Sequence, residues 1–356
     1  MSSMPGSLTR SVWWAVEVPG APAPWNVAHL RAFYRAAPTW SLAERMSGSL
    51  PAADPGVRRP VVLVVPGINI GQDSYRWLAE ALVDAGFVAV TFDLVGELMP
   101  GQYGTTPGLD LGAVTPESYG SRPTTPSLRA IHDALAVLDA GDGPLAGQLD
   151  LERVAWVGHS AGGSASLQSS SSQWFPELRA VVAYGCHGGV STALGWPEST
   201  VVESPATVPF LLVGGRRDGV IAGSAVRYGD GDAAEQSLVA RTFDESLVSS
   251  VDAVLVEFTD ATHFTLADPI DPTTARSFLD EEPGPAGDAT RELVAATIID
   301  FLRGHVADDE DALARVASLV EAPSAQVARA ARRTTKAMDT NTSPAETLGS
   351  ATVGEE

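Results

Sequence analysis

Cysteine, lysine and long apolar runs are nearly absent from this sequence of 356 residues. The one cysteine, Cys186, excludes an intrachain disulfide framework and a thiolate metal cluster. No apolar run approaches the roughly 20 residues of a membrane span, and residues 1–9 are polar where a signal peptide would begin. These absences predict a soluble, cytoplasmic protein.

Positive charge is scarce relative to negative charge. The chain has 23 Lys and Arg, of which Lys336 is the only lysine, against 44 Asp and Glu, so its formal net charge is −21. An acidic surface repels phosphate backbones and anionic lipid headgroups, so we expect no nucleic acid or membrane partner. Hydrophobic residues make up 44% of the chain, which is ample for a core, and the length suits one large α/β domain with extensions or two small domains.

Apolar β-branched runs alternate with helical patterns over the middle of the chain. Residues 60–65 and 87–92 are typical of strands that are buried on both faces of a sheet. Further strands are predicted at residues 153–157, 178–184, 208–213 and 252–258, and helices at residues 75–85, 127–139, 161–168 and 290–303. Strands that alternate with helices predict an α/β fold with a doubly wound, mostly parallel sheet.

Composition divides the chain into three parts. Residues 1–58 are an N-terminal extension that we expect to pack on the core, with a strand at residues 11–18 and a helix at residues 27–35. Residues 59–305 are the predicted α/β domain. Residues 306–356 are predicted to form a helical segment followed by a Ser/Thr/Ala-rich tail, whose lack of core residues is typical of disorder.

The strongest motif is Gly158-His159-Ser160-Ala161-Gly162, which has the pattern G-x-S-x-G between a predicted buried strand and a predicted helix. A sharp strand-to-helix turn forces its serine into a strained backbone conformation, so the residues two positions away must be small. The turn holds the hydroxyl above the N-terminus of the helix, whose dipole favours developing negative charge. The motif therefore predicts Ser160 as a nucleophile.

With this motif the sequence resembles the α/β-hydrolase superfamily, and within it the group of dienelactone hydrolases, chlorophyllases and cutinase-like polyester hydrolases. Four segments carry the resemblance in the family's order: Val65-Pro66-Gly67-Ile68-Asn69, Gly158-His159-Ser160-Ala161-Gly162-Gly163, Gly214-Gly215-Arg216-Arg217-Asp218 and Ala261-Thr262-His263-Phe264. They fall within about residues 58–305. The resemblance implies the α/β-hydrolase fold and a serine esterase that uses no cofactor.

A serine hydroxyl needs an imidazole to take its proton, and that imidazole needs a carboxylate to orient it. His263 fits the family's chain order of serine, acid and histidine, and His187 is its main rival. Asp218 follows a predicted strand and resembles the family's acid. The alternatives are Asp230, Asp232, Asp244 and Asp260. Asp230-Gly-Asp232 lacks the later ligands of a calcium loop, so we expect no metal there.

The resemblance also implies two backbone amides that would bind the oxyanion. One belongs to Ala161, which follows the nucleophile at the start of the helix. The other is assigned to Ile68, because Pro66-Gly67-Ile68 resembles the family's Pro-Gly-aromatic segment. The chain departs from the family here, since polyester hydrolases tend to place an aromatic ring at this position. An aliphatic surface is therefore expected beside the substrate.

Two irregular segments, residues 96–125 and 187–207, are expected to overhang the carboxyl edge of the sheet. Met99 and Tyr103 in the first segment are candidate substrate-binding residues. Trp196 in the second resembles a tryptophan that lines the acyl site of cutinase-like enzymes. Packing within the loops is the alternative role for each aromatic residue.

These features predict serine-dependent hydrolysis of a neutral, moderately apolar carboxylic ester through an acyl-enzyme intermediate. An acyltransferase or a cofactor-free perhydrolase stays open, because only the acceptor of the acyl group differs. A non-catalytic binding protein on a hydrolase scaffold is the alternative from another class. The sequence specifies neither the ester nor the oligomeric state.

Overall fold

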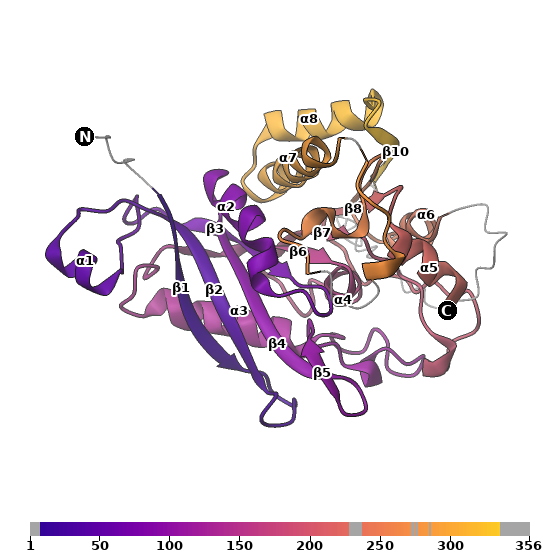
Figure 1. Cartoon of the computed structure of the whole chain (residues 1–356), viewed down its shortest axis with the longest axis horizontal. Coiled ribbons are helices and arrows are strands. Elements are labelled where there is room, and N and C mark those ends of the chain that lie inside the picture. Colours follow the sequence, from indigo (N-terminus) through magenta and orange to yellow (C-terminus); the bar gives the residue numbers. More distant parts are fainter. Residues whose placement is uncertain (1–7, 228–236, 272–273, 275–276, 285, 335–356) are drawn as a thin grey trace, which may run out of the picture.

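The computed structural model describes residues 8–227, 237–271, 274, 277–284 and 286–334. Over these residues the chain forms a ten-stranded sheet in the order β1-β2-β4-β3-β6-β7-β8-β9-β10, with β5 paired to β4 (Figure 1). The strands from β4 to β9 in this order run parallel, and antiparallel strands flank them. The predicted α/β fold with a mostly parallel sheet is confirmed.

The parallel strands carry the apolar runs that predicted them. They are β3 (Arg59–Val65), β4 (Val88–Met99), β6 (Leu149–His159), β7 (Leu178–Tyr184), β8 (Phe210–Gly215) and β9 (Asp252–Phe258). Successive side chains of a strand point to opposite faces of the sheet. In β3, Leu63 therefore packs in the core on one face and Val64 in the core on the other.

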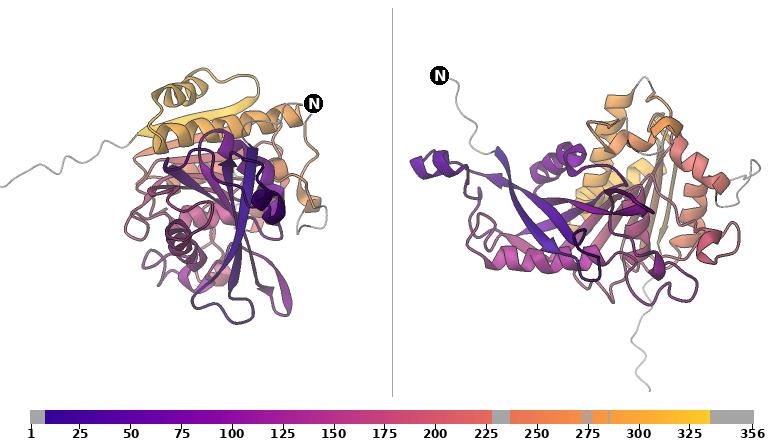
Figure 2. Two further views of the ribbon diagram at one scale, coloured as in Figure 1. Left: turned by 90° about the vertical axis from the view of Figure 1, so that its left-hand side faces the viewer. Right: turned by 60° about the horizontal axis from the view of Figure 1, so that its bottom comes forward.

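Helices cover both faces of the sheet, which is why its strands are apolar on both faces. The helices α2 (Arg76–Asp84), α7 (Gly287–Val306) and α8 (Glu310–Glu321) lie on one face (Figure 2). The helices α3 (Pro126–Ala140), α4 (Ala161–Ser169) and α6 (Leu238–Arg241) lie on the other. The remaining helical segments are α1 (Leu42–Ser47), η1 (Gln72–Tyr75), η2 (Leu111–Ala113), η3 (Thr192–Leu194), α5 (Gly219–Arg227), η4 (Thr242–Ser246), η5 (His263–Leu266) and η6 (Ser277–Leu279).

The N-terminal extension contributes two strands to the same sheet. The first strand, β1 (Leu8–Glu17), is close to the predicted one and pairs along its whole length with β2 (Val27–Ala36), which pairs in turn with β4. The helix predicted at residues 27–35 is therefore wrong. Buried residues recur in β2 with a period of two, and Leu30, Ala32 and Tyr34 enter the same side of the core, as in a strand.

The C-terminal part contains the predicted helical segment as α8, and a strand that was not predicted, β10 (Val327–Thr334). This strand is mostly Ala and Arg, with β-branched residues only at its two ends and no aromatic residue, so it shows little of the pattern that indicates a strand. It pairs with β9, and Arg332 donates two hydrogen bonds of 2.8 Å to Asp252 of that strand. The tail that was predicted to be disordered lies outside the described residues. Within the described part, no helix is long and apolar enough to cross a membrane.

Candidate active site

Ser160 occupies the sharp turn between β6 and α4, with the backbone angles φ +55° and ψ −121°. A positive φ is uncommon for a residue with a side chain, so this turn is strained, as the motif predicts. A Cβ on Gly158 would lie 2.4 Å from the carbonyl oxygen of Gly162, and one on Gly162 would lie 2.2 Å from that of Val65. Only glycine fits at these two positions.

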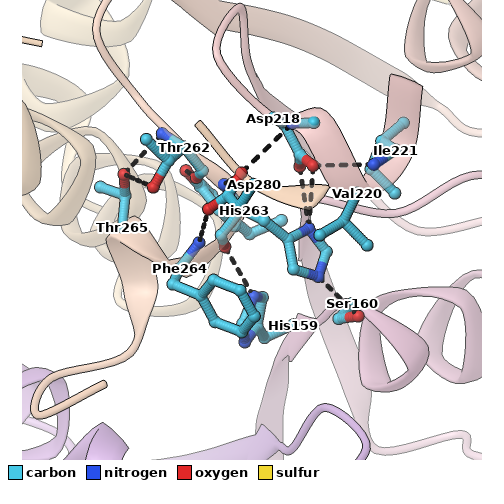
Figure 3. Close-up of polar contacts among 12 residues, drawn as sticks. His159, Ser160, Asp218, Val220, Ile221, Thr262, His263, Phe264, Thr265 and Asp280 are labelled. Atoms are coloured by element: carbon cyan, nitrogen blue, oxygen red, sulfur yellow. Dashed lines mark hydrogen bonds and ion pairs between the residues drawn. The ribbon is translucent and has the colours of Figure 1, made fainter. Parts of the chain in front are cut away.

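The structure brings Ser160, His263 and Asp218 into one hydrogen-bonded line (Figure 3). His263 Nε2 lies 2.9 Å from Ser160 Oγ, and His263 Nδ1 lies 2.9 and 3.1 Å from the two carboxylate oxygens of Asp218. A carboxylate only accepts hydrogen bonds, so Nδ1 carries the proton and Nε2 can accept the serine hydroxyl. Asp218 follows β8 and His263 follows β9, which places both at the carboxyl edge of the sheet.

Gly185, directly after β7, leaves the space in which this line forms. Its φ is +57°, and a Cβ there would lie 3.1 Å from a carboxylate oxygen of Asp218 and 3.2 Å from Nδ1 of His263. Asp218 is further held by the backbone N–H of Ile221, which donates to Oδ1 over 2.8 Å. The acid and the histidine are therefore fixed by the backbone around them as well as by each other.

Asp280 is a residue of this site that sequence reasoning missed. Its Oδ1 accepts hydrogen bonds from the backbone N–H groups of His263, at 3.0 Å, and Gly219, at 3.2 Å. Its Oδ2 accepts one from Phe264 at 3.3 Å. Burial raises the pKa of the Asp280 carboxyl. Asp280 ties the loop of the histidine to the segment after Asp218, and no motif in the sequence indicates this.

A second histidine, His159, is buried behind Ser160 beside Tyr75, another residue that sequence reasoning missed. His159 Nδ1 lies 2.8 Å from the hydroxyl of Tyr75, and its Nε2 lies 2.9 Å from the backbone oxygen of His263. Burial, aided by the nearby His263, lowers the pKa of His159 to about 3. His159 is therefore a neutral part of the wall around the site.

The two predicted oxyanion residues lie on backbone segments that adjoin Ser160. Ala161 is the first residue of α4, so its N–H has no acceptor within the helix. Ile68 follows Gly67, and a Cβ on Gly67 would lie 3.2 Å from Cβ of Ser160. The loop is held by Asn69, whose N–H donates to the Thr105 oxygen over 2.9 Å. Oxyanion binding by Ile68 and Ala161 stays a prediction.

The three candidate substrate-binding residues lie in different surroundings. Trp196 is half-buried, donates from Nε1 to the Val114 oxygen over 2.6 Å, and meets the ring of Tyr119 edge-on. Tyr103, in β5 (Gln102–Thr105), stacks on Trp25 at 4.5 Å and lines a cavity of about 820 Å³. Met99 is exposed at the end of β4. A contact between any of the three and substrate stays a prediction.

The alternative residues can also be placed. Within the described residues, His263 rather than His187 lies at hydrogen-bond distance from Ser160 Oγ. Asp244 lies 3.9 Å from Arg329, and Asp260 lies against Gly284. Asp230 and Asp232 lie outside the described residues. No group of three or more His, Cys, Asp or Glu suited to a metal ion occurs in the part of the chain that the structure describes.

No protein-family model matches this chain. The chain is 28% identical over 207 residues to a bis(hydroxyethyl) terephthalate hydrolase of Streptomyces coelicolor. These residues are 57% of this chain and 50% of that protein. It is also 25% identical over 203 residues to cutinase 1 of Thermobifida cellulosilytica and to a cutinase of Thermobifida fusca. The aligned residues cover 60% of the first protein and 52% of the second. The chain thus aligns with only 50–60% of the length of these relatives.

The fold is that of an α/β-hydrolase, with a serine at the turn after the central strand β6 and an acid and a histidine after β8 and β9. Among proteins of this fold, the chain is similar to cutinase-like polyester hydrolases. The resemblance expected from the four motif segments is confirmed.

Proposed function

We propose that this protein is a carboxylic ester hydrolase and that Ser160 is its nucleophile. The observation that carries the proposal is the line from Asp218 through His263 to Ser160, in which the acid and the histidine are buried and hydrogen bonds of 2.9 Å lie on both sides of the imidazole. The resemblance to relatives that are named as ester hydrolases supports the same reaction. The proposed substrate is a neutral, moderately apolar ester.

In the proposed reaction, Nε2 of His263 takes the proton of the Ser160 hydroxyl as Oγ attacks the ester carbonyl. The amides of Ile68 and Ala161 stabilise the negative charge on the carbonyl oxygen. The bond to the alcohol then breaks, and the alcohol leaves with the proton from His263. Water next gives a proton to His263 and attacks the carbonyl carbon of the acyl-serine. The bond from that carbon to Oγ then breaks, and His263 returns the proton to Oγ, which releases the acid and restores the hydroxyl.

The proposal is tested by labelling with a fluorophosphonate probe together with turnover of a p-nitrophenyl ester. An activated serine attacks the phosphorus of the probe and displaces fluoride, so we expect one label per chain, on the peptide that contains Ser160. Labelling is expected to remove ester turnover in proportion to the fraction labelled. A chain that takes no label and hydrolyses no ester would instead be a binding protein on a hydrolase scaffold.

We expect kcat/KM to increase from p-nitrophenyl acetate to esters of medium length. Each methylene buried in an apolar pocket is worth up to ~0.8 kcal/mol, which is about fourfold in kcat/KM. Trp196→Ala is expected to reduce this preference by raising KM for the longer ester. Trp196→Phe is the matched control, because it keeps a ring but removes the hydrogen bond to the Val114 oxygen. A flat series would argue against an apolar pocket, and an unchanged preference in Trp196→Ala would leave the residue a role in loop packing.

A further inference from the structure

Three buried hydrogen bonds join the loop before Ile68 to the backbone of His263. The N–H of Gly67 lies 2.9 Å from the hydroxyl oxygen of Tyr75, that oxygen lies 2.8 Å from His159 Nδ1, and His159 Nε2 lies 2.9 Å from the His263 oxygen. The side chains of Tyr75 and His159 are fully buried. This line and the line that contains Asp218 share His263: the first ends at its backbone oxygen, and the second runs through its imidazole.

The chemistry of the two ends fixes the direction of every bond in this line. A backbone N–H only donates, so the Tyr75 oxygen accepts from Gly67. A backbone carbonyl only accepts, so Nε2 of His159 carries the ring proton and donates to His263. Nδ1 of His159 is then an acceptor, and the Tyr75 hydroxyl donates to it. All three bonds form at once with His159 neutral and Tyr75 protonated.

Burial holds both side chains in these forms. It lowers the pKa of His159 to about 3 and raises the pKa of the Tyr75 hydroxyl far above its usual range. Neither group changes its charge at neutral pH, so the line does not itself move protons. Its three bonds, of 2.8 to 2.9 Å, are all buried. The loss of one partner would therefore leave a polar group without a hydrogen bond and away from water.

We infer that Tyr75 and His159 are positioning residues that set the oxyanion loop and the His263 backbone relative to Ser160. The inference rests on the proposed ester hydrolysis. Gly67 precedes Ile68, whose amide is the proposed oxyanion donor, and His159 directly precedes Ser160 in the chain. One line of hydrogen bonds thus connects the loop that carries the proposed oxyanion donor, the residue before the nucleophile and the backbone of the proposed base. Misplacement of such groups by a fraction of an ångström lowers the rate of the chemical step more than it weakens substrate binding.

Tyr75→Phe removes the central hydroxyl and keeps the ring. We expect kcat for a p-nitrophenyl ester to fall by about 10- to 100-fold with KM changed by less than about threefold. Phenylboronic acid is the second probe, because Ser160 Oγ adds to its boron to give a tetrahedral anion that resembles the transition state. Its inhibition constant is expected to rise by the same factor by which kcat/KM falls, since both depend on the oxyanion donors.

Tyr34→Phe is the matched control. Tyr34 is also buried and its hydroxyl donates to a backbone oxygen, that of Leu50 over 2.7 Å, but it lies in β2 away from Ser160. Tyr34→Phe loses one buried hydrogen bond and Tyr75→Phe loses two, so both variants are expected to fold with a lowered Tm, and the decrease is expected to be larger for Tyr75→Phe. Only Tyr75→Phe is expected to change kcat and boronate inhibition. Equal kinetics in the two variants, or a loss confined to KM, would overturn the inference.

His159→Asn and His159→Gln are each designed to keep one of the two side-chain hydrogen bonds of His159 and to remove the other. The asparagine oxygen can reach the place of Nδ1 and accept from Tyr75, whereas the longer glutamine can donate to the His263 oxygen from the place of Nε2. Each variant is expected to lower kcat, and Tyr75→Phe is expected to lower it less in His159→Gln than in the wild type, because the bond between Tyr75 and residue 159 is already gone there while the bond from Gly67 remains. Full additivity would contradict a shared role. If Tyr75→Phe does not fold, kcat and boronate inhibition are compared between His159→Asn and Tyr34→Phe instead. Equal kinetics in these two variants would likewise overturn the inference.

Failure of the inference and failure of the proposed function give different results. If wild-type protein hydrolyses the ester and takes the fluorophosphonate label, but Tyr75→Phe behaves like Tyr34→Phe, only the positioning role is wrong. If the wild-type protein shows neither turnover nor labelling, the ester hydrolase proposal is wrong, and the positioning role falls with it.

Discussion

Ser160→Ala is expected to lower kcat/KM for ester hydrolysis by at least about a thousandfold and to leave the fold intact. Removal of the nucleophile from a serine–histidine pair typically costs several orders of magnitude in rate. The backbone bonds at this turn, from the Ser160 N–H to the Tyr184 oxygen and from Ser164 to the Ser160 oxygen, do not use the hydroxyl. Alanine occupies the same strained conformation with one polar atom fewer, so the stability should change by less than about 1 kcal/mol.

The measurement is the turnover of a p-nitrophenyl ester, with circular dichroism and Tm as checks on the fold. Ser164→Ala is a suitable control, because its hydroxyl lies one turn further along α4 and donates to the His187 oxygen over 3.0 Å. This variant is expected to keep wild-type activity and to take the fluorophosphonate label. Should Ser160→Ala retain more than about a hundredth of the wild-type rate, another residue is the nucleophile.

The parts of the fold that the sequence predicts well are those in which one physical requirement acts locally. The run Pro60-Val-Val-Leu-Val-Val65 suits a strand covered on both faces and little else, and it is β3. The turn around Ser160 was predicted for a similar reason. Its backbone passes so close to neighbouring carbonyl oxygens that glycine is required at positions 158 and 162, and that requirement is visible in the sequence.

The parts that were missed depend on partners far away in the chain. The segment of β2 has apolar residues at spacings that fit either a helix or a strand. It is a strand because it pairs with β4, which lies about 60 residues later in the chain. Asp280 joins the site because its segment returns to Gly219 and His263, so its role follows from tertiary structure alone. In the sequence, Tyr75 is likewise only one apolar position of a predicted helix. Its role depends on His159, which the fold places beside it.

The pH dependence of turnover is expected to belong to His263. An imidazole with a proton on both nitrogens cannot accept the proton of Ser160, whose Oγ lies 2.9 Å from Nε2. The form that acts as a base has Nε2 free and keeps its Nδ1 proton in the hydrogen bond to Asp218. The value of kcat/KM should therefore rise with pH through a single ionisation. His263→Ala should abolish the rise and lower the rate by at least about a thousandfold.

The comparison is made by recording kcat/KM from about pH 5 to about pH 9 for wild type, His263→Ala and His187→Gln. The other histidine near the nucleophile, His159, cannot produce the rise, because burial lowers its pKa to about 3, below this range. His187→Gln tests the remaining rival and is expected to keep both the activity and the pH step. If the residual activity of His263→Ala still rises with pH at the wild-type position, the proton of Ser160 goes to a different base, and the line from Asp218 to Ser160 serves to hold the loop after β9 in place.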